Sequence, residues 1–353
     1  MPGFDDFLAA APDDRRDAFL AAGRRLGTPE QNVEKDFWVC WTLNALFNQL
    51  PAGSPRLLFK GGTSLSKAFG LISRFSEDID ITVFRDDLGE EASIEALEAL
   101  SNKKRRAKLD AIREACQAYI AGPLRARLGA VFKEALERAE ISTKGPRLEL
   151  DPDDPDRQSI LLWYPSVTVA DDGYIRPVVK LEAGAKSALD PHHLTSVMAY
   201  VGEETPGLSL TVGNITVVDA GRSFWDKVVI LHGLRRWFDK RQVLRGGGQR
   251  VSRHYYDVHR LYRSETGAAA IGNTALGQDC VRHARMFFSS TDLDLASAAP
   301  CTFSLVPTPP MLELLERDYR AMAGMIFGPI PPFGEVMASV AELEQRVNQQ
   351  PEP

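Results

Sequence analysis

The stretch from Lys60 to Ile81 reads KGGTSLSKAFGLISRFSEDIDI, and it decides the fold that the sequence predicts. The run before it, RLLFKGG (56–62), is short, apolar and closed by glycines, as is typical of a buried strand that enters a tight turn. TSLSKAFGLI (63–72) suits a short helix, and EDIDITVF (77–84) alternates acidic with apolar residues, as a half-buried strand does. The stretch therefore predicts a strand, a turn, a helix and a second strand.

Two carboxylates of the second strand form a candidate metal site. Asp78 and Asp80 should share one face, with Ile79 buried behind them, because successive side chains of a strand point to opposite faces. Carboxylates held about 6–7 Å apart repel each other unless a cation lies between them. Such oxygen ligands suit Mg²⁺, which also binds substrate phosphates. Taken alone, an Asp-x-Asp pattern is more often surface charge on an edge strand.

The glycine turn before this strand is a candidate phosphate site. Two glycines leave backbone N–H groups accessible, and two hydroxyl residues follow at the start of a helix, where an anion is favoured. Lys60, just before the glycines, could support the turn or cap the strand end. Lys67, one turn along the short helix, faces either phosphate or solvent. A glycine pair alone most often marks only a tight turn. The candidates for nucleotide binding here are Lys60, Gly61, Gly62, Thr63, Ser64 and Lys67.

The rest of the chain predicts an α+β fold with helices first, a mixed middle and a helical last third. Expected helices cover 4–26, 28–50, two or three segments within 90–140, a long helix after Asp219, and 250–264, 274–290 and 309–327. Expected strands lie in 147–167, 174–185 and 214–218, with irregular structure around DPHHL (190–194) and a disordered tail NQQPEP (348–353). We therefore expect a domain over 1–218, with a helical insertion near 86–145, and a helical domain over 219–353.

Composition places the chain among soluble globular proteins. It has 353 residues, 44% of them hydrophobic, with a formal net charge of −6. Four dispersed cysteines, an acidic N-terminus without a signal-peptide core and no long apolar run predict a cytoplasmic protein with reduced thiols. Three basic runs, at 103–108, 235–241 and 245–253, are either solvated helix faces or a surface for nucleic-acid phosphates.

Segment 59–83, FKGGTSLSKAFGLISRFSEDIDITV, closely resembles the motif of the AbiEii/AbiGii toxin family, nucleotidyltransferase-like proteins of the polymerase-beta type. VEKDFWVCWTLNALF (33–47), RSFWDKVVILHGL (222–234) and SRHYYDVHRL (252–261) resemble further segments of that family in the same order. The resemblance implies a polymerase-beta-type mixed sheet with flanking helices, carboxylates for two Mg²⁺ ions and an NTP substrate. It also implies the toxin of a type IV toxin–antitoxin system, a cognate antitoxin protein, and RNA, in particular the acceptor end of tRNA, as target.

Further candidate residues join this site. Glu182 is the candidate third carboxylate, because it shares one face of a strand with Lys180; its alternative is an ion pair with that lysine or contact with solvent. Lys227 is expected to reach the triphosphate, or else to extend along its helix to solvent. The resemblance carries over Asp257, which could instead bond Arg253 or Arg260. Arg253 is a candidate for phosphate binding, and Arg74 and Ser76 are expected to orient Asp78.

The sequence thus predicts an Mg²⁺-dependent nucleotidyltransferase that moves an NMP from an NTP onto an acceptor and acts as a toxin. The catalytic candidates are Asp78, Asp80, Glu182, Lys227 and Asp257, of which the first three are the metal candidates. The alternatives are a nucleotidyltransferase that modifies a protein or small molecule, and a non-catalytic nucleotide or RNA binder of the same fold. No residue is recognisable as a reader of the nucleotide base.

Overall fold

A computed structural model describes residues 3–76, 78–168, 176–205, 207–248, 250–299 and 301–349. The chain forms two compact units, each assembled from several segments. Unit 1 comprises Met1–Ala68, Phe75–Ala92 and Arg106–Val217, and unit 2 comprises Phe69–Arg74, Ser93–Arg105 and Val218–Pro353. The division into domains 1–218 and 219–353 that the sequence suggests stays a prediction.

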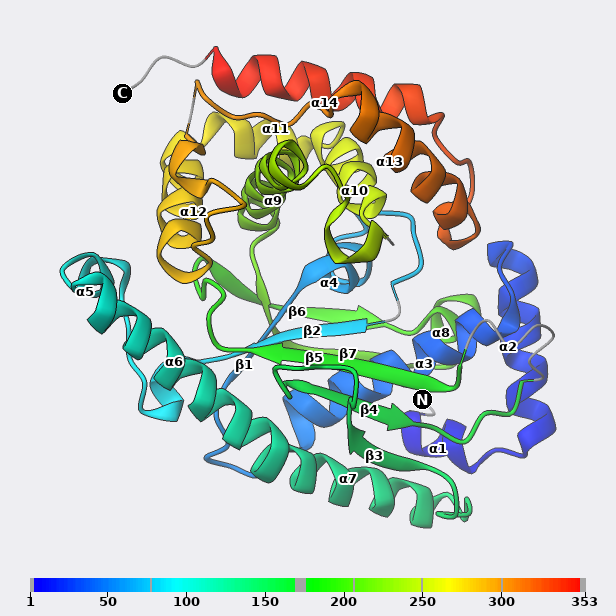
Figure 1. The fold of residues 1–353 in the computed structure, drawn as a ribbon. Coiled ribbons are helices and arrows are strands. Elements are labelled where there is room, and N and C mark those ends of the chain that lie inside the picture. The colour runs from blue at the N-terminus through cyan, green and yellow to red at the C-terminus, as the bar shows by residue number, and fades with distance from the viewer. Residues whose placement is uncertain are drawn as a thin grey trace. The chain divides into compact units, whose positions relative to one another are not determined.

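A mixed seven-stranded sheet forms the centre of unit 1, in the order β3-β4-β5-β2-β1-β7-β6 (Figure 1). β2 is parallel to β5 and β1 is parallel to β7, whereas the β1–β2, β3–β4 and β4–β5 pairs are antiparallel. This confirms the α+β class with a mixed sheet. The strands are β1 (Leu57–Lys60), β2 (Asp78–Val83), β3 (Arg147–Leu150), β4 (Ser159–Trp163), β5 (Val178–Gly184), β6 (His192–Met198) and β7 (Thr211–Val218).

Helices cover this sheet, and α3 (Glu30–Asn44) packs on β5. The sequence suggests an apolar face on α3, but the helix is buried all round from Asn32 to Leu43. Its Trp38 stacks on Tyr164 with ring centroids 5.3 Å apart and meets the edge of Phe132 at 5.9 Å. The other helices are α1 (Phe4–Ala9), α2 (Pro12–Leu26), α4 (Gly61–Lys67), α6 (Asn102–Tyr119), which begins in unit 2, α7 (Arg125–Arg138) and α8 (Tyr200–Glu204).

Unit 2 is helical, and α9 (Ala220–Arg241) is the helix that packs on α10, α11 and α12 (Figure 1). The Asp219 side chain caps it by accepting a hydrogen bond from the Gly221 N–H at 2.8 Å. A Cβ at Gly277 would lie 2.8 Å from the Trp225 ring, so a glycine is needed where α12 approaches α9. The surrounding helices are α5 (Ile94–Glu98), α10 (Ser252–Tyr262), α11 (Glu265–Gly272), α12 (Thr274–Phe287), α13 (Pro309–Met322) and α14 (Phe333–Asn348).

The structure differs from the expected elements at a few places. The segment around DPHHL is not irregular throughout, because His192–Met198 pairs with β7 as the edge strand β6. The helix expected over 63–72 ends at Lys67. Part of the expected disordered tail, Asn348, belongs to α14, and residues 350–353 lie outside the described residues. Among the described residues, the helices are too short or too polar to cross a bilayer.

The turn between β1 and α4 is fixed by a left-handed glycine. Gly61 has φ +80°, and a Cβ built on it would lie 2.1 Å from the Asp80 Oδ2 atom. A side chain at this position would therefore be strained in the backbone and would also collide with the carboxylate of the neighbouring strand. Gly53 has nearly the same φ, +81°, with no atom within 4 Å of an added Cβ.

This pair of glycines gives a matched test. Both Gly61→Ala and Gly53→Ala should lose about 1–2 kcal/mol of unfolding free energy from the left-handed backbone. Gly61→Ala should lose a further ~1–3 kcal/mol, because the methyl group must displace Asp80 or its strand. Urea unfolding of the two variants measures the difference. Equal losses would mean that the close approach to Asp80 does not constrain the turn.

Candidate active site

The two aspartates of β2 lie on one face of the sheet, as the alternation predicts. Asp78 and Asp80 are half-buried, whereas Ile79 and Ile81 on the opposite face are fully buried. Lys60, the register partner of Asp80 on β1, places its ammonium 3.8 Å from the Asp80 Oδ1 atom. The glycine turn and the carboxylate of Asp80 therefore meet within unit 1.

Strand β5 adds Glu182 to the same face. In the parallel pairing of β2 with β5, Asp80 lies beside Glu182 and Asp78 lies beside Lys180. The Lys180 ammonium contacts Glu182 at 2.9 Å and Asp151 at 3.1 Å. Burial opposes the charge of Lys180, but its hydrogen bonds to the two carboxylates outweigh burial and raise its pKa. Glu182 thus makes the ion pair that was the alternative to metal binding, and its metal role stays a prediction.

The donor chemistry of this face fits a hard divalent cation. Asp78, Asp80 and Glu182 offer carboxylate oxygens from neighbouring register positions, and the missing side chain of Gly61 lets the Asp80 carboxylate occupy the place that a Cβ would take. The described residues contain no cluster of three or more His, Cys, Asp or Glu side chains arranged to hold a metal by themselves. Mg²⁺ is usually shared among one or two carboxylates, water and substrate phosphates, and its binding by these carboxylates stays a prediction.

The hydroxyls of the turn hold the turn together. Thr63 and Ser64 are buried. The Thr63 hydroxyl contacts the Ser76 hydroxyl at 2.8 Å and the Asp78 carbonyl oxygen, and the Ser64 hydroxyl donates to the Gly61 carbonyl at 2.9 Å. Thr63 therefore links the turn to Ser76 and to the start of β2, and a role of Ser76 in orienting the Asp78 carboxylate stays a prediction. Phosphate binding by either hydroxyl stays a prediction, and it would require these hydrogen bonds to rearrange.

The side chain of Lys67 has different surroundings from those that the sequence suggests. Its side chain faces neither solvent nor an open turn: it is 3% exposed, and its ammonium contacts the Asp36 carboxylate of α3 at 2.9 Å. The same ammonium lies 3.5 Å from the ring centroid of Tyr200. Burial opposes the charge of this lysine, but the Asp36 carboxylate outweighs it and raises the Lys67 pKa. The contacts tie α4 to α3 and α8, and they do not favour a role in nucleotide binding, which no observation tests.

Lys227 and Asp257 come together in unit 2. The fully buried Asp257 accepts hydrogen bonds from the Arg74 guanidinium at 2.7 and 2.9 Å and from the Lys227 ammonium at 2.8 Å. Burial alone would raise the pKa of this carboxyl, but Arg74 and Lys227 together lower it well below its ordinary value. The expected partners of Asp257, Arg253 and Arg260, are not the ones it uses.

Arg74 was expected to orient Asp78, which stays a prediction; the structure shows its side chain bonded to Asp257. Its backbone also pairs with Ile326, and the Ser73 carbonyl accepts a hydrogen bond from the Phe327 N–H at 2.8 Å. Segment 69–74 is therefore part of unit 2, although it joins α4 to β2. Arg253 is half-buried on α10 and makes no ion pair with the described residues.

The structure thus groups the candidates into two sets. Lys60, Gly61, Gly62, Thr63, Ser64, Asp78, Asp80 and Glu182 lie together on unit 1, with Lys67 buried behind the turn, whereas Lys227, Asp257 and Arg253 belong to unit 2. Sequence reasoning missed Asp36, Asp151 and the Arg74 pairing. Nothing in the local sequence signals these residues, because their partners are distant along the chain.

Asp257→Asn should cost about 3–5 kcal/mol of unfolding free energy at pH 7, because it leaves two buried cations without a carboxylate. The pKa of Asp257 is lowered by folding, so its contribution is present above its ordinary value of 3.8 and is lost as the pH falls. The gap between wild type and variant in urea unfolding should therefore narrow below about pH 4.

Glu342→Gln is the matched control in unit 2, since Glu342 pairs with Arg263 at 3.3 Å on the surface. It should change the unfolding free energy by less than about 1 kcal/mol. A loss at Asp257→Asn as small as in this control would show that the buried cluster is not what holds segment 69–74.

Comparisons with known proteins place the chain in a family. No curated protein matches it. Among solved structures, MenT4, a nucleotidyltransferase toxin from Mycobacterium tuberculosis H37Rv, is similar with a TM-score of 0.42 and 17% identity, over 94% of this chain and 97% of that chain. The family described as "Nucleotidyl transferase AbiEii toxin, Type IV TA system" matches residues 44–342. The chain therefore belongs to the AbiEii family of nucleotidyltransferase toxins of type IV toxin–antitoxin systems.

Proposed function

We propose that this nucleotidyltransferase toxin is Mg²⁺-dependent, acts in the cytoplasm and moves an NMP from an NTP onto the acceptor end of tRNA, until a cognate antitoxin protein counters it. The observation that carries the proposal is the meeting of turn and carboxylates on unit 1. Gly61 has no room for a side chain beside Asp80, and Asp80 lies next to Glu182 across two parallel strands. A triphosphate bound at the turn would thereby lie beside the acidic face.

Each residue has a task in this proposal. The first N–H groups of α4 lack intrahelical acceptors and bind the β- and γ-phosphates at Gly61 and Gly62. Asp78 and Asp80, aided by Glu182, hold Mg²⁺. Bound there, Mg²⁺ supplies charge stabilisation for the leaving pyrophosphate and activates the attacking hydroxyl. Lys60 and Lys180 balance the carboxylates on the same face.

The proposal also includes unit 2 residues that the family resemblance brings in. Lys227 supplies a point charge to the triphosphate, and Asp257 holds that lysine in place through the 2.8 Å contact. Arg253, which has no carboxylate partner among the described residues, is a candidate for phosphate of the NTP or of the RNA.

Asp80→Asn should reduce NMP incorporation from labelled NTP into RNA roughly 10³-fold or more, because a metal-binding carboxylate contributes several kcal/mol to the transition state. The measurement incubates the protein with each of the four labelled NTPs, Mg²⁺ and total cellular RNA. Asp86→Asn is the control, since Asp86 is exposed just beyond β2. Both variants should unfold at the wild-type urea concentration.

The same assay separates the acceptors. Label in the tRNA fraction supports the proposal. Label in protein or in small molecules would replace RNA by another acceptor while leaving the nucleotidyltransferase in place. Full activity of the Asp80→Asn variant would eliminate the metal site itself.

Chelation gives a second test. EDTA should abolish incorporation, and added Mg²⁺ should restore it, because the carboxylates alone cannot neutralise a pyrophosphate leaving group. The melting temperature should stay unchanged, since Lys60 and Lys180 already balance Asp80 and Glu182 without an ion. Undiminished incorporation in EDTA would contradict Mg²⁺ dependence.

A further inference from the structure

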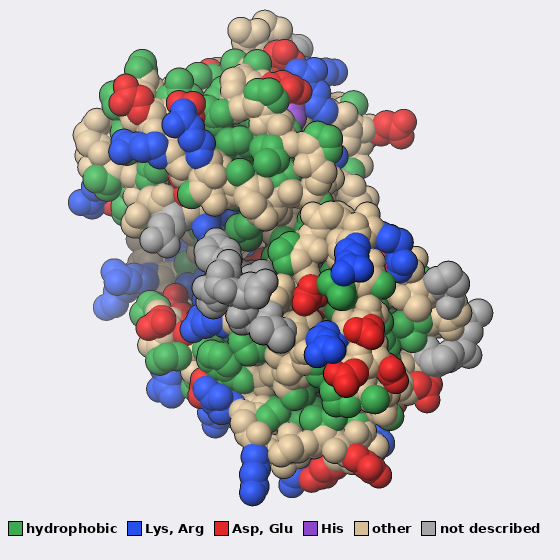
Figure 2. All heavy atoms as spheres, turned by 90° about the vertical axis from the view of Figure 1, so that its right-hand side faces the viewer, with side chains coloured by type: hydrophobic (Ala, Val, Ile, Leu, Met, Phe, Trp, Pro, Cys, Tyr) green, Lys and Arg blue, Asp and Glu red, His purple; other side chains and the backbone are tan. Residues whose placement is uncertain are grey.

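The three basic runs differ in what their side chains already bind. On the face drawn in Figure 2, acidic and basic side chains are interspersed among apolar ones. A binding surface for RNA must therefore be sought where cations lack acidic neighbours, because only such cations can exchange counterions for RNA phosphates.

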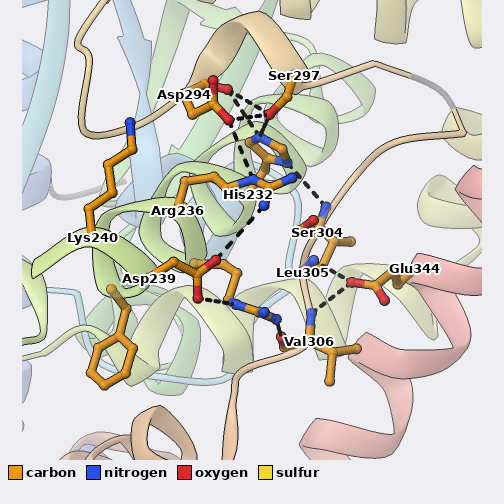
Figure 3. Close-up of polar contacts among 12 residues, drawn as sticks. His232, Arg236, Asp239, Lys240, Asp294, Ser297, Ser304, Leu305, Val306 and Glu344 are labelled. Carbon is orange, nitrogen blue, oxygen red and sulfur yellow. Dashed lines mark hydrogen bonds and ion pairs between the residues drawn. The ribbon is translucent and has the colours of Figure 1, made fainter. Parts of the chain in front are cut away.

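The basic side chains of the run on α9 already bind other groups of unit 2 (Figure 3). Arg235 pairs with Asp239 at 2.9 Å and bonds the Val306 carbonyl. Arg236 lies 3.9 Å from Asp239 and 3.7 Å from Asp294. These side chains hold the loop before α13 and the loop after α12 against α9.

The remaining cations of that run are also engaged. Lys240 donates to the Thr291 carbonyl, and Arg241 pairs with Asp292 at 2.7 Å. Farther along, the Arg245 guanidinium lies 5.8 Å from the ring centroid of Trp237. The run over 235–241 is thus an internal clamp of unit 2 and offers few charges to a partner.

The basic side chains at the start of α6 are not bound in this way. Lys103 and Lys104 are exposed and make no ion pair with the described residues. No acidic side chain lies in the first turn of the 18-residue helix. Cations at a helix N-terminus oppose the helix dipole, so this placement costs helix stability rather than adding to it. The two lysines are therefore better explained by an anionic partner than by the helix.

An exposed aromatic ring belongs to the neighbouring turn of unit 2. Arg105 follows the two lysines, and its guanidinium contacts the Met286 sulfur at 3.6 Å, near the end of α12. Phe288, immediately after α12, is 46% exposed. Its ring centroid lies 5.9 Å from that of His283, which in turn stacks on Phe287 at 4.4 Å. Phe288 thus packs against the buried pair of His283 and Phe287, and the rest of its ring is exposed to solvent.

One arginine of α12 partly balances the acidic residues that α5 presents to it. Glu95 and Glu98 of α5 are the acidic residues that bind α12, and both pair with Arg282, at 3.3 and 2.7 Å. One guanidinium for two carboxylates leaves a single negative charge here, against the two lysines at the start of α6 that are unpaired among the described residues, and Phe288 is exposed just after α12.

We infer that Lys103, Lys104 and Phe288 bind a single-stranded segment of the RNA acceptor, with the lysines on phosphates and the phenyl ring under a base. This inference rests on the proposed function and specifies its partner surface. Stacking on an aromatic ring next to a basic surface is how single strands are held without sequence preference. The inference also gives a role to the start of α6, which belongs to the helical insertion, and it excludes the basic run on α9 from the RNA-binding surface.

The test measures RNA binding separately from catalysis. All variants are made in the Asp80→Asn protein. Binding of unmodified total tRNA is measured by filter binding from about 50 to 300 mM KCl, roughly the range over which salt weakens phosphate contacts. Lys103→Ala with Lys104→Ala should reduce the slope of log K against log salt by about 1.4, at about 0.7 per lysine. Lys133→Ala with Lys144→Ala, which removes two exposed lysines of unit 1, should leave the slope unchanged.

The aromatic contact has its own pair of variants. Phe288→Leu should weaken tRNA binding at least about fivefold, because leucine keeps the apolar surface but cannot stack, and Phe288→Tyr should retain it. Arg236→Ala with Arg241→Ala should not lower the salt slope.

The outcomes separate this inference from the function on which it rests. If the wild-type protein labels RNA but the lysine variant binds tRNA with the slope of the unit 1 control, the surface is wrong and the function stands. If the wild-type protein labels only protein or small molecules, the proposed RNA acceptor fails, and this inference fails with it.

Discussion

The acidic face of unit 1 depends on the missing side chain at Gly61. The backbone there turns through a conformation that glycine adopts without strain, and the space that a Cβ would fill is taken by the Asp80 carboxylate. Because β1 and β2 are antiparallel neighbours, the residue before this glycine, Lys60, lies opposite Asp80. One glycine thus lets the turn that we propose for phosphate and the carboxylate that we propose for Mg²⁺ share one small region of the sheet.

Buried charge pairs fix the elements on which that region rests. Asp36 and Lys67 connect the third helix to the short helix after the turn, and the contact with Tyr200 adds α8. In unit 2, one carboxylate, Asp257, serves two cations from different segments. Such pairs add little net stability compared with apolar packing, but removing one partner strongly lowers the unfolding free energy. They therefore specify which segments must pack together.

The sequence predicted the parts of the site that are local. The strand, turn, helix and strand around Gly61 follow from glycine chemistry and period-two alternation, and the shared face of Asp78 and Asp80 follows from the strand alone. Edge strand β6 was missed because His192–Met198 has little alternation and becomes a strand by pairing with β7. The partners of Lys67 and Arg74, 31 and 183 residues away, follow from tertiary structure and leave no local pattern. For Glu182 the strand was predictable, but its ion pair with Lys180 was one of two alternatives that the sequence left open, the other being a metal ion.

The path of segment 69–74 has a consequence for dissecting this protein. Residues 69–74, which lie between the two halves of the nucleotidyltransferase motif, fold with the C-terminal helices, where Arg74 pairs with Asp257. A truncated gene ending after β7 would encode both halves of the motif, but its product would lack the Asp257 carboxylate that binds Arg74 in this segment. The two parts of the toxin are therefore not expected to fold when they are expressed separately. A truncated protein would need the C-terminal helices added as a second chain before segment 69–74 could take up its structure.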